Sequence, residues 1–241
     1  MAGGLGTRLG ILTKITNKHL LPVYDKPMIF YPLQILLNAN IKEILIISGP
    51  EYSGHFLRLL GSGRDFKVRF TYEVQDEPKG IAHALSLARE FADDNNIAVI
   101  LGDNIFEDNF SKEINEFRGG STIFLKHVED AARYGVVELD ANKIISIEEK
   151  PTNPKSDYAM TGLYLFDSRV FDIIKTLKPS WRNQFEITDA VNSYLKKDLL
   201  TYYIVNGFWT DAGTFDSLYN ASNFIKENKA GINNKNTAEI K

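Results

Sequence analysis

The sequence predicts a mixed α/β fold in which a doubly wound sheet is flanked by helices. Residues 43–49 (EILIISG) and 97–101 (IAVIL) are short apolar runs, each leading into a glycine, as in strands buried on both faces of a sheet. Helical stretches are expected at 28–37 and 80–92, and 68–74 alternates as a strand. This β-α-β order is typical of open α/β sheets, which bind ligands at the carboxyl ends of their strands.

The second half of the chain is richer in predicted strands. We expect strands at 122–128, 135–139, 144–149 and 158–166, helices at 170–177, 187–196 and 215–226, and a hairpin turn at 140–142. No internal repeat or low-complexity linker interrupts the sequence. We therefore expect a single domain, followed by a polar tail at 228–241 that frays.

Composition narrows the class of protein. The chain has 241 residues, 44% hydrophobic and 24% charged, with a net charge of -3 and no cysteine. The lack of cysteine excludes a disulfide scaffold, a thiolate metal site and a cysteine nucleophile. No apolar run approaches the roughly 20 residues that span a bilayer, and the start does not resemble a signal peptide. Since the net charge does not favour nonspecific nucleic-acid binding, we expect a cytoplasmic protein that binds neither nucleic acid nor membrane.

A glycine-rich segment, AGGLGTRLG, occupies residues 2–10. Glycines let successive N–H groups turn toward an anion and let the backbone approach a phosphate closely, while Arg8 offers a planar fork for phosphate oxygens. The segment is not a Walker A loop, because no Gly-Lys-Ser/Thr follows, and Leu9 breaks the G-x-G-x-x-G spacing. Taken alone, it is equally well explained as a plain turn.

Three charged side chains sit where a phosphate or metal site is expected. Lys18 precedes the apolar stretch Leu-Leu-Pro, Asp103 follows a buried strand in ILGDN, and Asp211 lies in FWTDAGT. Hard Mg²⁺ prefers one or two carboxylates together with phosphate oxygens and water, so the two aspartates would suffice. The alternatives are a solvated lysine in a loop and aspartates that form turns.

A second group of polar residues closes strands in the other half. Lys150 could neutralise a phosphate while Glu149 accepts hydrogen bonds from hydroxyl groups, although a solvated strand end is the favoured explanation when this motif is taken alone. Gly135, after Tyr134, opens the preceding strand, where a glycine lets a ligand approach the backbone. Further on, Thr188 and Asp189 fall in the first turn of a predicted helix, with Glu186 as a candidate cap or bridge.

In this order, the motifs resemble those of the sugar-nucleotide pyrophosphorylases, a family of nucleotidyltransferases, and most closely its short members that use dTTP. The resemblance runs from Ala2 to about Phe224 and rests on AGGLGTRL, NKHLLPVYDKPMIFYPL, ILIISGPE, VQDEPKGIAHAL, VILGDNIF, RYGVVE, ISIEEKP, YAMTGLYLFD, FEITD and WTDAGT. It implies a Rossmann-like, mostly parallel mixed sheet flanked by helices, with a β-rich sugar-binding part. About 1–120 would be the nucleotide-binding half and about 121–227 the sugar-phosphate-binding half.

The resemblance also implies a reaction. A phosphate oxygen of α-D-glucose 1-phosphate would attack the α-phosphorus of dTTP in line, with Mg²⁺ as cofactor, to give dTDP-glucose and pyrophosphate. Thymine and uracil differ by one methyl, worth about 0.8 kcal/mol, so UTP is the alternative nucleotide. On family grounds alone, we expect a homo-oligomer.

The family's functional residues carry over in three groups. The nucleotide would be bound by Gly3, Gly4, Leu5, Gly6, Gln75 and Gly80. The charged groups of the reaction would be Arg8, Lys18, Asp103 and Lys150, with Mg²⁺ held by Asp103 and Asp211. The sugar phosphate would be lined by Tyr134, Gly135, Glu149, Lys150, Thr161, Gly162 and Arg182.

The sequence departs from the family pattern at its start. Members of the family place a short apolar strand before the glycine-rich segment, whereas here Met1 directly precedes Ala2. Either an upstream segment is left out or the central strand is absent, which would leave the glycine-rich segment untethered. In addition, His19 stands where longer members have glutamine, which puts a base or phosphate contact there in doubt.

Two other functions remain open. A non-catalytic sugar-nucleotide sensor would explain the departures, but the joint presence of the charged residues argues against it. A nicotinamide-dependent dehydrogenase is disfavoured by the glycine spacing.

Overall fold

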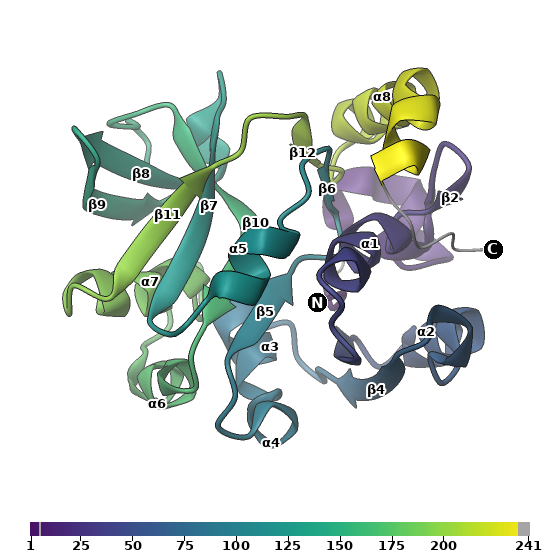
Figure 1. Cartoon of the computed structure of the whole chain (residues 1–241), viewed down its shortest axis with the longest axis horizontal. Helices are drawn as coiled ribbons and strands as arrows, with labels where there is room; N and C mark the ends of the chain where they lie inside the picture. The colour runs from purple at the N-terminus through teal and green to yellow at the C-terminus, as the bar shows by residue number, and fades with distance from the viewer. Residues whose placement is uncertain (5, 236–241) are drawn as a thin grey trace. The chain divides into compact units, whose positions relative to one another are not determined.

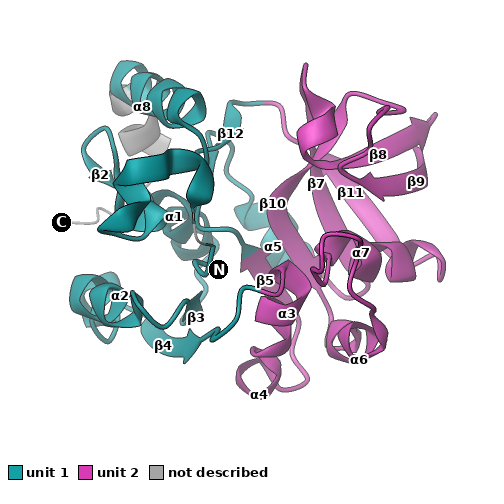
Figure 2. Cartoon of the chain, turned by 180° about the vertical axis from the view of Figure 1, so that it is seen from behind, with its two compact units in different colours: residues 1–78, 100–116, 207–241 teal, residues 79–99, 117–206 magenta. Residues whose placement is uncertain are grey.

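The computed structural model describes residues 1–4 and 6–235, with side chains up to residue 228. The predicted position Leu5 therefore lies outside the described residues. The chain forms two compact units, which Figure 2 distinguishes by colour: unit 1 is Met1–Pro78, Ile100–Glu116 and Gly207–Lys241, and unit 2 is Lys79–Val99 and Phe117–Asn206. Each unit collects segments that are distant in sequence. The functional division near residue 120 stays a prediction.

Unit 1 contains pairs of short strands with helices around them (Figure 1). Its parallel pair joins β3 (Glu43–Ser48) to β4 (Arg69–Val74), with Glu43 opposite Arg69 and Ser48 opposite Val74. Its antiparallel pairs are β1 (Pro22–Val23) with β2 (Lys26–Pro27), and β6 (Asn104–Phe106) with β12 (Trp209–Asp211). Its helices are η1 (Thr7–Lys14), η2 (Lys18–Leu20), α1 (Phe30–Asn38), α2 (Ser53–Leu60), η3 (Arg64–Phe66), α5 (Ser111–Glu116) and α8 (Phe215–Lys235).

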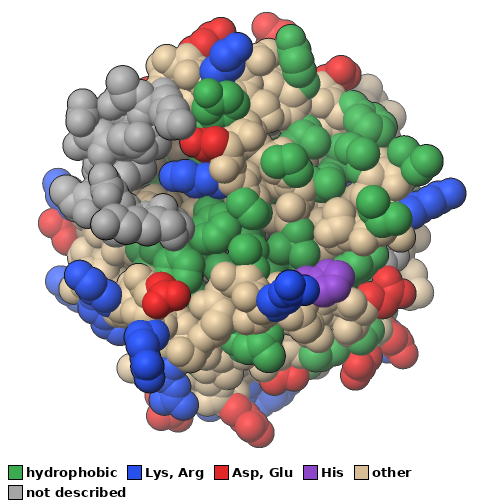
Figure 3. Space-filling model, turned by 90° about the vertical axis from the view of Figure 1, so that its right-hand side faces the viewer, with side chains coloured by type: hydrophobic (Ala, Val, Ile, Leu, Met, Phe, Trp, Pro, Cys, Tyr) green, Lys and Arg blue, Asp and Glu red, His purple; other side chains and the backbone are tan. Residues whose placement is uncertain are grey.

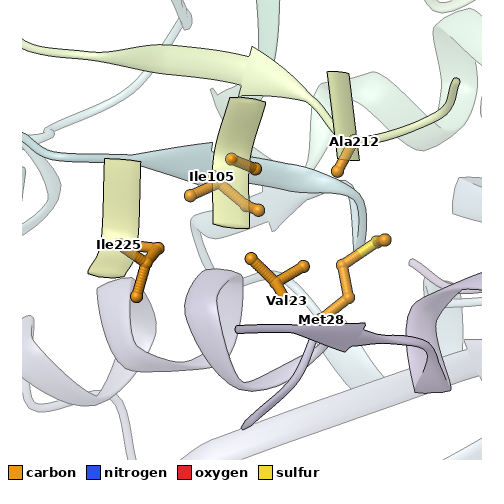
Figure 4. Close-up of a cluster of buried hydrophobic side chains, with 6 residues drawn as sticks. Val23, Met28, Ile105, Ala212 and Ile225 are labelled. Carbon is orange, nitrogen blue, oxygen red and sulfur yellow. The ribbon is translucent and has the colours of Figure 1, made fainter. Parts of the chain in front are cut away.

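A buried apolar cluster joins the distant segments of unit 1. Figure 4 shows Val23, Met28, Ile105, Ala212 and Ile225 converging from the β1–β2 hairpin, β6, the end of β12 and α8. Burying such side chains is worth roughly 1.5–3 kcal/mol each for the larger ones, so the cluster secures the ends of β6 and β12. These are the strand ends that carry the predicted aspartates.

Unit 2 is built on a six-stranded mixed sheet. Its order is β11 (Leu200–Ile204), β7 (Ser121–His127), β10 (Tyr158–Phe166), β8 (Gly135–Asp140) and β9 (Lys143–Glu149), and β5 (Ile97–Ile100) also pairs with β10. The pair β11–β7 is parallel, whereas β10–β7, β10–β8 and β8–β9 are antiparallel. The helices are α3 (Ile81–Ser86), α4 (Arg89–Ala92), η4 (Ala131–Arg133), α6 (Arg169–Thr176) and α7 (Ile187–Leu195).

The mixed α/β class is confirmed, and most predicted elements are present within one or two residues. The helix predicted at 80–92 is instead two short helices, α3 and α4. The break follows Ser86, whose hydroxyl donates to the carbonyl of His83 at 2.7 Å, because such a bond competes with continued helix. At the other end, α8 continues through Lys235, so residues 228–235 are helical rather than frayed.

The start of the chain is tied on both sides within unit 1. Ala2 forms a parallel bridge with Ser48 and donates its N–H to the carbonyl of Ile47 at 2.6 Å. On the other side, the carbonyl of Met1 accepts from the N–H of Gly102 at 2.8 Å. The expectation of an untethered glycine-rich segment is therefore wrong, because backbone bonds hold its first residues beside the end of β3.

The residues directly after the glycine-rich segment leave large apolar side chains in water. Ile11 is 73% exposed and Ile15 is 84% exposed, both in or directly after η1. Figure 3 shows one face, on which hydrophobic side chains gather between separate acidic and basic ones. The described part of that face therefore carries charges of both signs.

None of the described helices is long and apolar enough to cross a membrane.

We predict that Asp167 is a structural centre of unit 2. Its carboxylate accepts from the N–H of Gly120 at 2.6 Å, from Arg169 Nε at 2.9 Å and from the hydroxyl of Tyr194 at 2.8 Å. Removing it leaves these donors without their acceptor, so Asp167→Ala should lower the free energy of unfolding by about 3 kcal/mol, as measured by urea denaturation. Asp172→Ala removes an exposed aspartate of α6 and should cost less than about 1 kcal/mol. Equal losses in the two variants would contradict the prediction.

Candidate active site

The predicted cation Lys18 and the predicted carboxylate Asp103 form a buried ion pair in unit 1. Lys18 Nζ donates to Asp103 Oδ2, and the two side chains are 11% and 12% exposed. Asn104 donates from Nδ2 to the other carboxylate oxygen at 2.9 Å and is itself held by Trp209 Nε1 at 2.8 Å. Two interpretations from the sequence, a solvated lysine in a loop for Lys18 and an aspartate that only forms a turn for Asp103, are therefore wrong.

The surroundings of Asp103 keep it ionised. Burial acts to raise the pKa of Asp103, but the Lys18 ammonium, His19 and hydrogen bonds from Lys18 and Asn104 outweigh it and hold the pKa well below its usual range. Burial and the Lys18 ammonium lower the pKa of His19, which therefore remains neutral at physiological pH. Unit 1 thus holds a fixed negative charge beside a fixed positive charge.

His19 is part of the support for Lys18. It is 2% exposed, and its Nδ1 lies 2.6 Å from Asn17 Oδ1, which also accepts the His19 N–H at 2.9 Å. Asn17 donates from Nδ2 to the carbonyl of Ala2 at 3.2 Å. These contacts join the start of the glycine-rich segment to the loop that carries Lys18.

The second aspartate lies on the strand paired with the one that follows Asp103. Asp211 on β12 is the register partner of Asn104, and the Ala212 N–H donates to the Asp103 carbonyl at 2.8 Å. Asp211 Oδ2 lies 3.5 Å from Arg8 Nη2, and the Arg8 side chain is 53% exposed. The pairing brings both predicted metal ligands to one end of a two-stranded ladder, with the Arg8 guanidinium beside them.

Gln75 lies against the glycine-rich segment. It is 6% exposed and extends the β3–β4 ladder by donating its N–H to the Ser48 carbonyl at 2.8 Å. A Cβ added to Gly3 would come within 2.6 Å of Gln75 Oε1, so only glycine allows this approach. Two residues predicted to bind the nucleotide are therefore neighbours in unit 1.

In unit 2, the predicted carboxylate Glu149 is surrounded by polar partners. Thr188 Oγ1 donates to Glu149 Oε2 at 2.5 Å, and Arg182 Nη1 lies 3.4 Å from Oε1. Lys150 Nζ lies 4.0 Å from Oε1, and its side chain is 39% exposed. Burial and the charge of Glu186 raise the pKa of Glu149, while the hydrogen bond from Thr188 opposes that rise. The interpretation of Glu149 as a solvated residue at a strand end is therefore wrong.

Neighbouring strands bring other predicted sugar-phosphate residues toward Glu149. Gly135 is its register partner across β8–β9, and Tyr134 accepts the N–H of Lys150 at 2.9 Å. The pairing of β10 with β7 shifts register between Met160 and Tyr164, the segment that contains Thr161 and Gly162. Such irregularities are common beside active sites. The Thr161 hydroxyl is buried and has no hydrogen-bond partner among the described residues.

Two predicted residues have contacts that their assignments did not include. Gly80 belongs to unit 2, where an added Cβ would lie 2.5 Å from the carbonyl of Phe185. Close packing against Phe185 therefore explains why position 80 is a glycine. Arg182 Nη1 is 3.3 Å from Glu186 Oε1 as well as near Glu149, so two carboxylates neutralise it.

Comparison with known proteins identifies the family. The sequence model of the nucleotidyl transferase family matches residues 1–228. The chain belongs to the nucleotidyl transferase family. A glucose-1-phosphate thymidylyltransferase of Neisseria gonorrhoeae is 47% identical over 94% of this chain and 81% of that protein. One of Mycobacterium tuberculosis is 41% identical over 96% of this chain and 83% of that protein.

Solved structures agree on the fold. A Bacillus anthracis protein described as a glucose-1-phosphate thymidylyltransferase, in complex with sucrose, is 49% identical, with a TM-score of 0.90 over 94% of this chain and 93% of that chain. A UDP-glucose pyrophosphorylase in complex with UDP-glucose is 26% identical, with a TM-score of 0.82 over 94% of this chain and 96% of that chain. The fold is therefore that of nucleotide-diphospho-sugar transferases.

The donor set of this nucleotidyl transferase suits a hard cation that is also bound by substrate. Among the described residues, no group of three or more histidine, aspartate or glutamate side chains could hold a metal ion on its own. Asp103, directly before β6, and Asp211, on the paired strand β12, provide two carboxylates, and Mg²⁺ usually binds through one or two carboxylates plus phosphate oxygens and water. The residues present thus fit Mg²⁺ bound with a triphosphate.

The sequence reasoning missed residues that support the charged groups. Asn17 holds the glycine-rich segment and Asn104 holds Asp103, each through its side-chain amide. The signal for them in the sequence was that each asparagine is the immediate neighbour of a predicted site residue, Lys18 or Asp103. Glu186 forms no side-chain cap on α7 and instead accepts from Ser180 Oγ at 2.8 Å and pairs with Arg182. Of the two roles expected for Glu186, the bridge is therefore confirmed and the cap is wrong.

We predict a pH-dependent loss of stability when the buried ion pair is broken. Lys18→Met removes the cation and leaves Asp103 buried without compensation, which should cost roughly 3–5 kcal/mol at about pH 7 in urea unfolding. In the parent protein the folded-state pKa of Asp103 is depressed, so its stabilisation is present above the unfolded pKa, about 3.9, and is lost as the pH falls. In the variant, protonation of Asp103 relieves the buried charge.

Without Lys18, burial raises the folded-state pKa of Asp103 in the variant above the unfolded value of about 3.9, so the stability gap between parent and Lys18→Met should narrow as the pH falls from about 7 toward 3.5. Lys175→Met, which breaks an exposed pair with Asp172, serves as the control and should cost less than about 1 kcal/mol at either pH. A gap that stays constant from about pH 7 to pH 3.5 would show that the Asp103 charge is not its cause.

Proposed function

We propose that this chain is a Mg²⁺-dependent nucleotidylyltransferase that joins dTTP and α-D-glucose 1-phosphate to give dTDP-glucose and pyrophosphate. The observation that carries the proposal is the similarity, over nearly the whole chain, to relatives named for this activity. The clustered charges of unit 1 and the polar group around Glu149 support it. They offer cations and carboxylates for phosphate transfer, a reaction that depends on positioning and charge neutralisation.

The charges of unit 1 suit a triphosphate. Arg8 presents a half-exposed planar guanidinium that can pair with two phosphate oxygens. It forms an ion pair with Asp211 and lies close to the backbone of Gly213. Lys18, which pairs with Asp103, adds a second cationic group, an ammonium that is buried. The sugar phosphate oxygen attacks the α-phosphorus in line and forms a new P–O bond. The bond from the α-phosphorus to the oxygen bridging the β-phosphate breaks, and pyrophosphate leaves with the electron pair. Arg8 and Lys18 would stabilise that developing charge.

Asp103 and Asp211 would hold the Mg²⁺. When bound, the ion supplies charge neutralisation and orientation of the phosphates. Asp103 suits this role because its environment keeps it ionised without help from the metal.

In unit 2, Glu149 and Lys150 suit the sugar phosphate. Glu149 offers carboxylate lone pairs to sugar hydroxyls, and the exposed Lys150 ammonium offers a charge for the phosphate. The unpaired Thr161 hydroxyl is a further candidate contact. Arg182 is already neutralised by two carboxylates, so we assign the phosphate to Lys150 rather than to Arg182.

The base would be read by Gln75, whose amide lies against Gly3. Thymine and uracil share the edge that an amide can read, and apolar contacts discriminate a single methyl only about 10–200-fold. The relatives favour dTTP, so we expect dTTP to be used in preference to UTP.

The first test is the reaction itself. With dTTP, glucose 1-phosphate and Mg²⁺, the protein should release pyrophosphate in a coupled assay, and kcat/KM should be higher for dTTP than for UTP by about 10-fold or more. No release above a protein-free blank would refute the activity. Calorimetric binding of dTDP-glucose without turnover would then favour a non-catalytic sensor.

We predict that Arg8 contributes to the chemical step. Arg8→Ala should lower kcat by at least about 100-fold, the scale of one lost contact to transition-state charge. Arg58→Ala removes an exposed arginine of α2 and should leave kcat unchanged. If both variants keep the parent rate, Arg8 has no role in the reaction.

We also expect a homo-oligomer, as the family resemblance implies, and a cytoplasmic location, as the composition indicates. Sedimentation velocity at working concentrations should show an assembly, and a monomer alone would contradict this expectation.

A further inference from the structure

Both oxygens of the Glu149 carboxylate have partners, and the partners of one oxygen differ in kind from those of the other. Thr188 Oγ1 holds Oε2 at 2.5 Å, whereas Arg182 lies 3.4 Å from Oε1 and Lys150 4.0 Å from the same oxygen. The hydroxyl bond is the shorter and better fixed of these contacts. The orientation of the carboxylate is therefore set mainly by Thr188.

The Thr188 hydroxyl is not used to cap its own helix. Thr188 is the second residue of α7, whose N-cap residue, Glu186, does not cap the helix through its side chain. A threonine that stabilises a helix start normally sits at the N-cap and accepts from a backbone N–H. Here the side chain is 1% exposed and points its hydroxyl at Glu149. The helix-start interpretation therefore does not account for this residue.

The support behind Thr188 is rigid. Asn192, one turn further along α7, donates from Nδ2 to the carbonyl of Ile147 on β9, the strand that ends at Glu149, at 3.0 Å. On β8, a Cβ added to Gly135 would lie 3.2 Å from Thr188 Oγ1 and 3.5 Å from Glu149 Oε2. The hydroxyl and the carboxylate thus meet directly over a backbone that has no side chain.

We propose that Thr188 is the positioning residue that aims the Glu149 carboxylate at a sugar hydroxyl and so contributes to the selection of the sugar phosphate. This inference rests on the proposed function, because it assigns Glu149 to the sugar. An ionised carboxylate has about four lone-pair sites, and the bond from Thr188 occupies one of them in a fixed direction. The remaining sites on Oε2 are directed by that bond toward the ligand.

The consequence is separable from fold stability and from nucleotide binding. If Thr188 only stabilised unit 2, its loss would lower the melting temperature and leave the Michaelis constants unchanged. If it aims Glu149, its loss weakens recognition of the sugar phosphate alone. Lys18, Asp103, Arg8 and Gln75 belong to unit 1. Gly80, the predicted nucleotide contact in unit 2, packs against the backbone of Phe185 rather than against Thr188, so the KM for dTTP should not change.

The decisive comparison uses three variants of the full chain. Thr188→Val keeps the shape and removes the hydroxyl, and Thr188→Ser keeps the hydroxyl. Thr122→Val is the matched control, because Thr122 is 3% exposed in the same unit and its hydroxyl bonds Thr201 at 2.8 Å instead of Glu149. In Thr188→Val, the KM for glucose 1-phosphate should rise roughly tenfold, the scale of one hydrogen bond to a charged group, with KM for dTTP within about twofold of the parent.

Thr188→Ser and Thr122→Val should both keep the KM for glucose 1-phosphate within about twofold of the parent. A series of monodeoxyglucose 1-phosphates then locates the hydroxyl: with one analogue, Thr188→Val and the parent should become equal. The proposal is overturned if Thr188→Val matches Thr122→Val, if it raises both Michaelis constants together, or if its defect is the same with every analogue.

A second readout does not need turnover. Calorimetric titration with dTDP-glucose should give a dissociation constant about tenfold weaker for Thr188→Val than for Thr188→Ser. Absence of pyrophosphate release from the parent would count against the proposed activity, whereas equal dissociation constants for these two variants would count against the role of Thr188.

Discussion

Unit 1 depends on one buried ion pair, between Lys18 and Asp103. Moving two charges out of water costs several kcal/mol each, and their attraction offsets this only when the remaining hydrogen-bonding positions are also filled. Here Lys18 and Asn104 each take one oxygen of Asp103, and Trp209 in turn fixes Asn104. The pair therefore binds together the segment after the glycine-rich segment, the turn before β6 and, through Asn104 and Trp209, strand β12. The same constraint explains why the two predicted metal ligands arrive at one place.

The carboxylates of the two units are placed in opposite electrostatic settings. Asp103 meets a buried ammonium, and its pKa is held low, so it is a permanent negative charge. Glu149 is buried near a second acid, Glu186, and its pKa is raised, although Arg182 and Lys150 limit the rise. A fixed charge suits a cation and a triphosphate, whereas a carboxylate held by a hydroxyl and a guanidinium suits directional hydrogen bonds to neutral hydroxyls. Environment thus distinguishes two roles that composition alone could not.

The sequence was most informative where local chemistry decides the structure. The apolar run at 43–49 predicted β3, and the extended segments at 135–139 and 144–149 with a turn at 140–142 predicted the β8–β9 hairpin, because strands and turns leave local signals in the sequence. Asp103 was predicted as a site residue because it follows a buried strand. Its pairing with Lys18, 85 positions away, left no local signal, since only the folded chain brings the two together. Thr188 was interpreted as part of a helix start for the same reason: its partner Glu149 is 39 positions away.

Glycines at the predicted sites act chiefly through the side chain that they lack. An added Cβ would lie 2.6 Å from Gln75 Oε1 at Gly3, 2.8 Å from Arg8 Nη2 at Gly213, and 2.9 Å from the Met160 side chain at Gly135. The side chains of Gln75 and Arg8, for which we propose functions, therefore lie directly against the backbone of Gly3 and Gly213. The Thr188 hydroxyl and the Glu149 carboxylate lie against the backbone of Gly135 in the same way. Rigid backbone beneath a functional group limits its rotamers, which lowers the entropy lost when substrate binds. The glycine-rich segment was interpreted from sequence as a phosphate cradle, but Gly3 also has a second effect. It lets Gln75, the residue predicted to read the base, lie against the backbone.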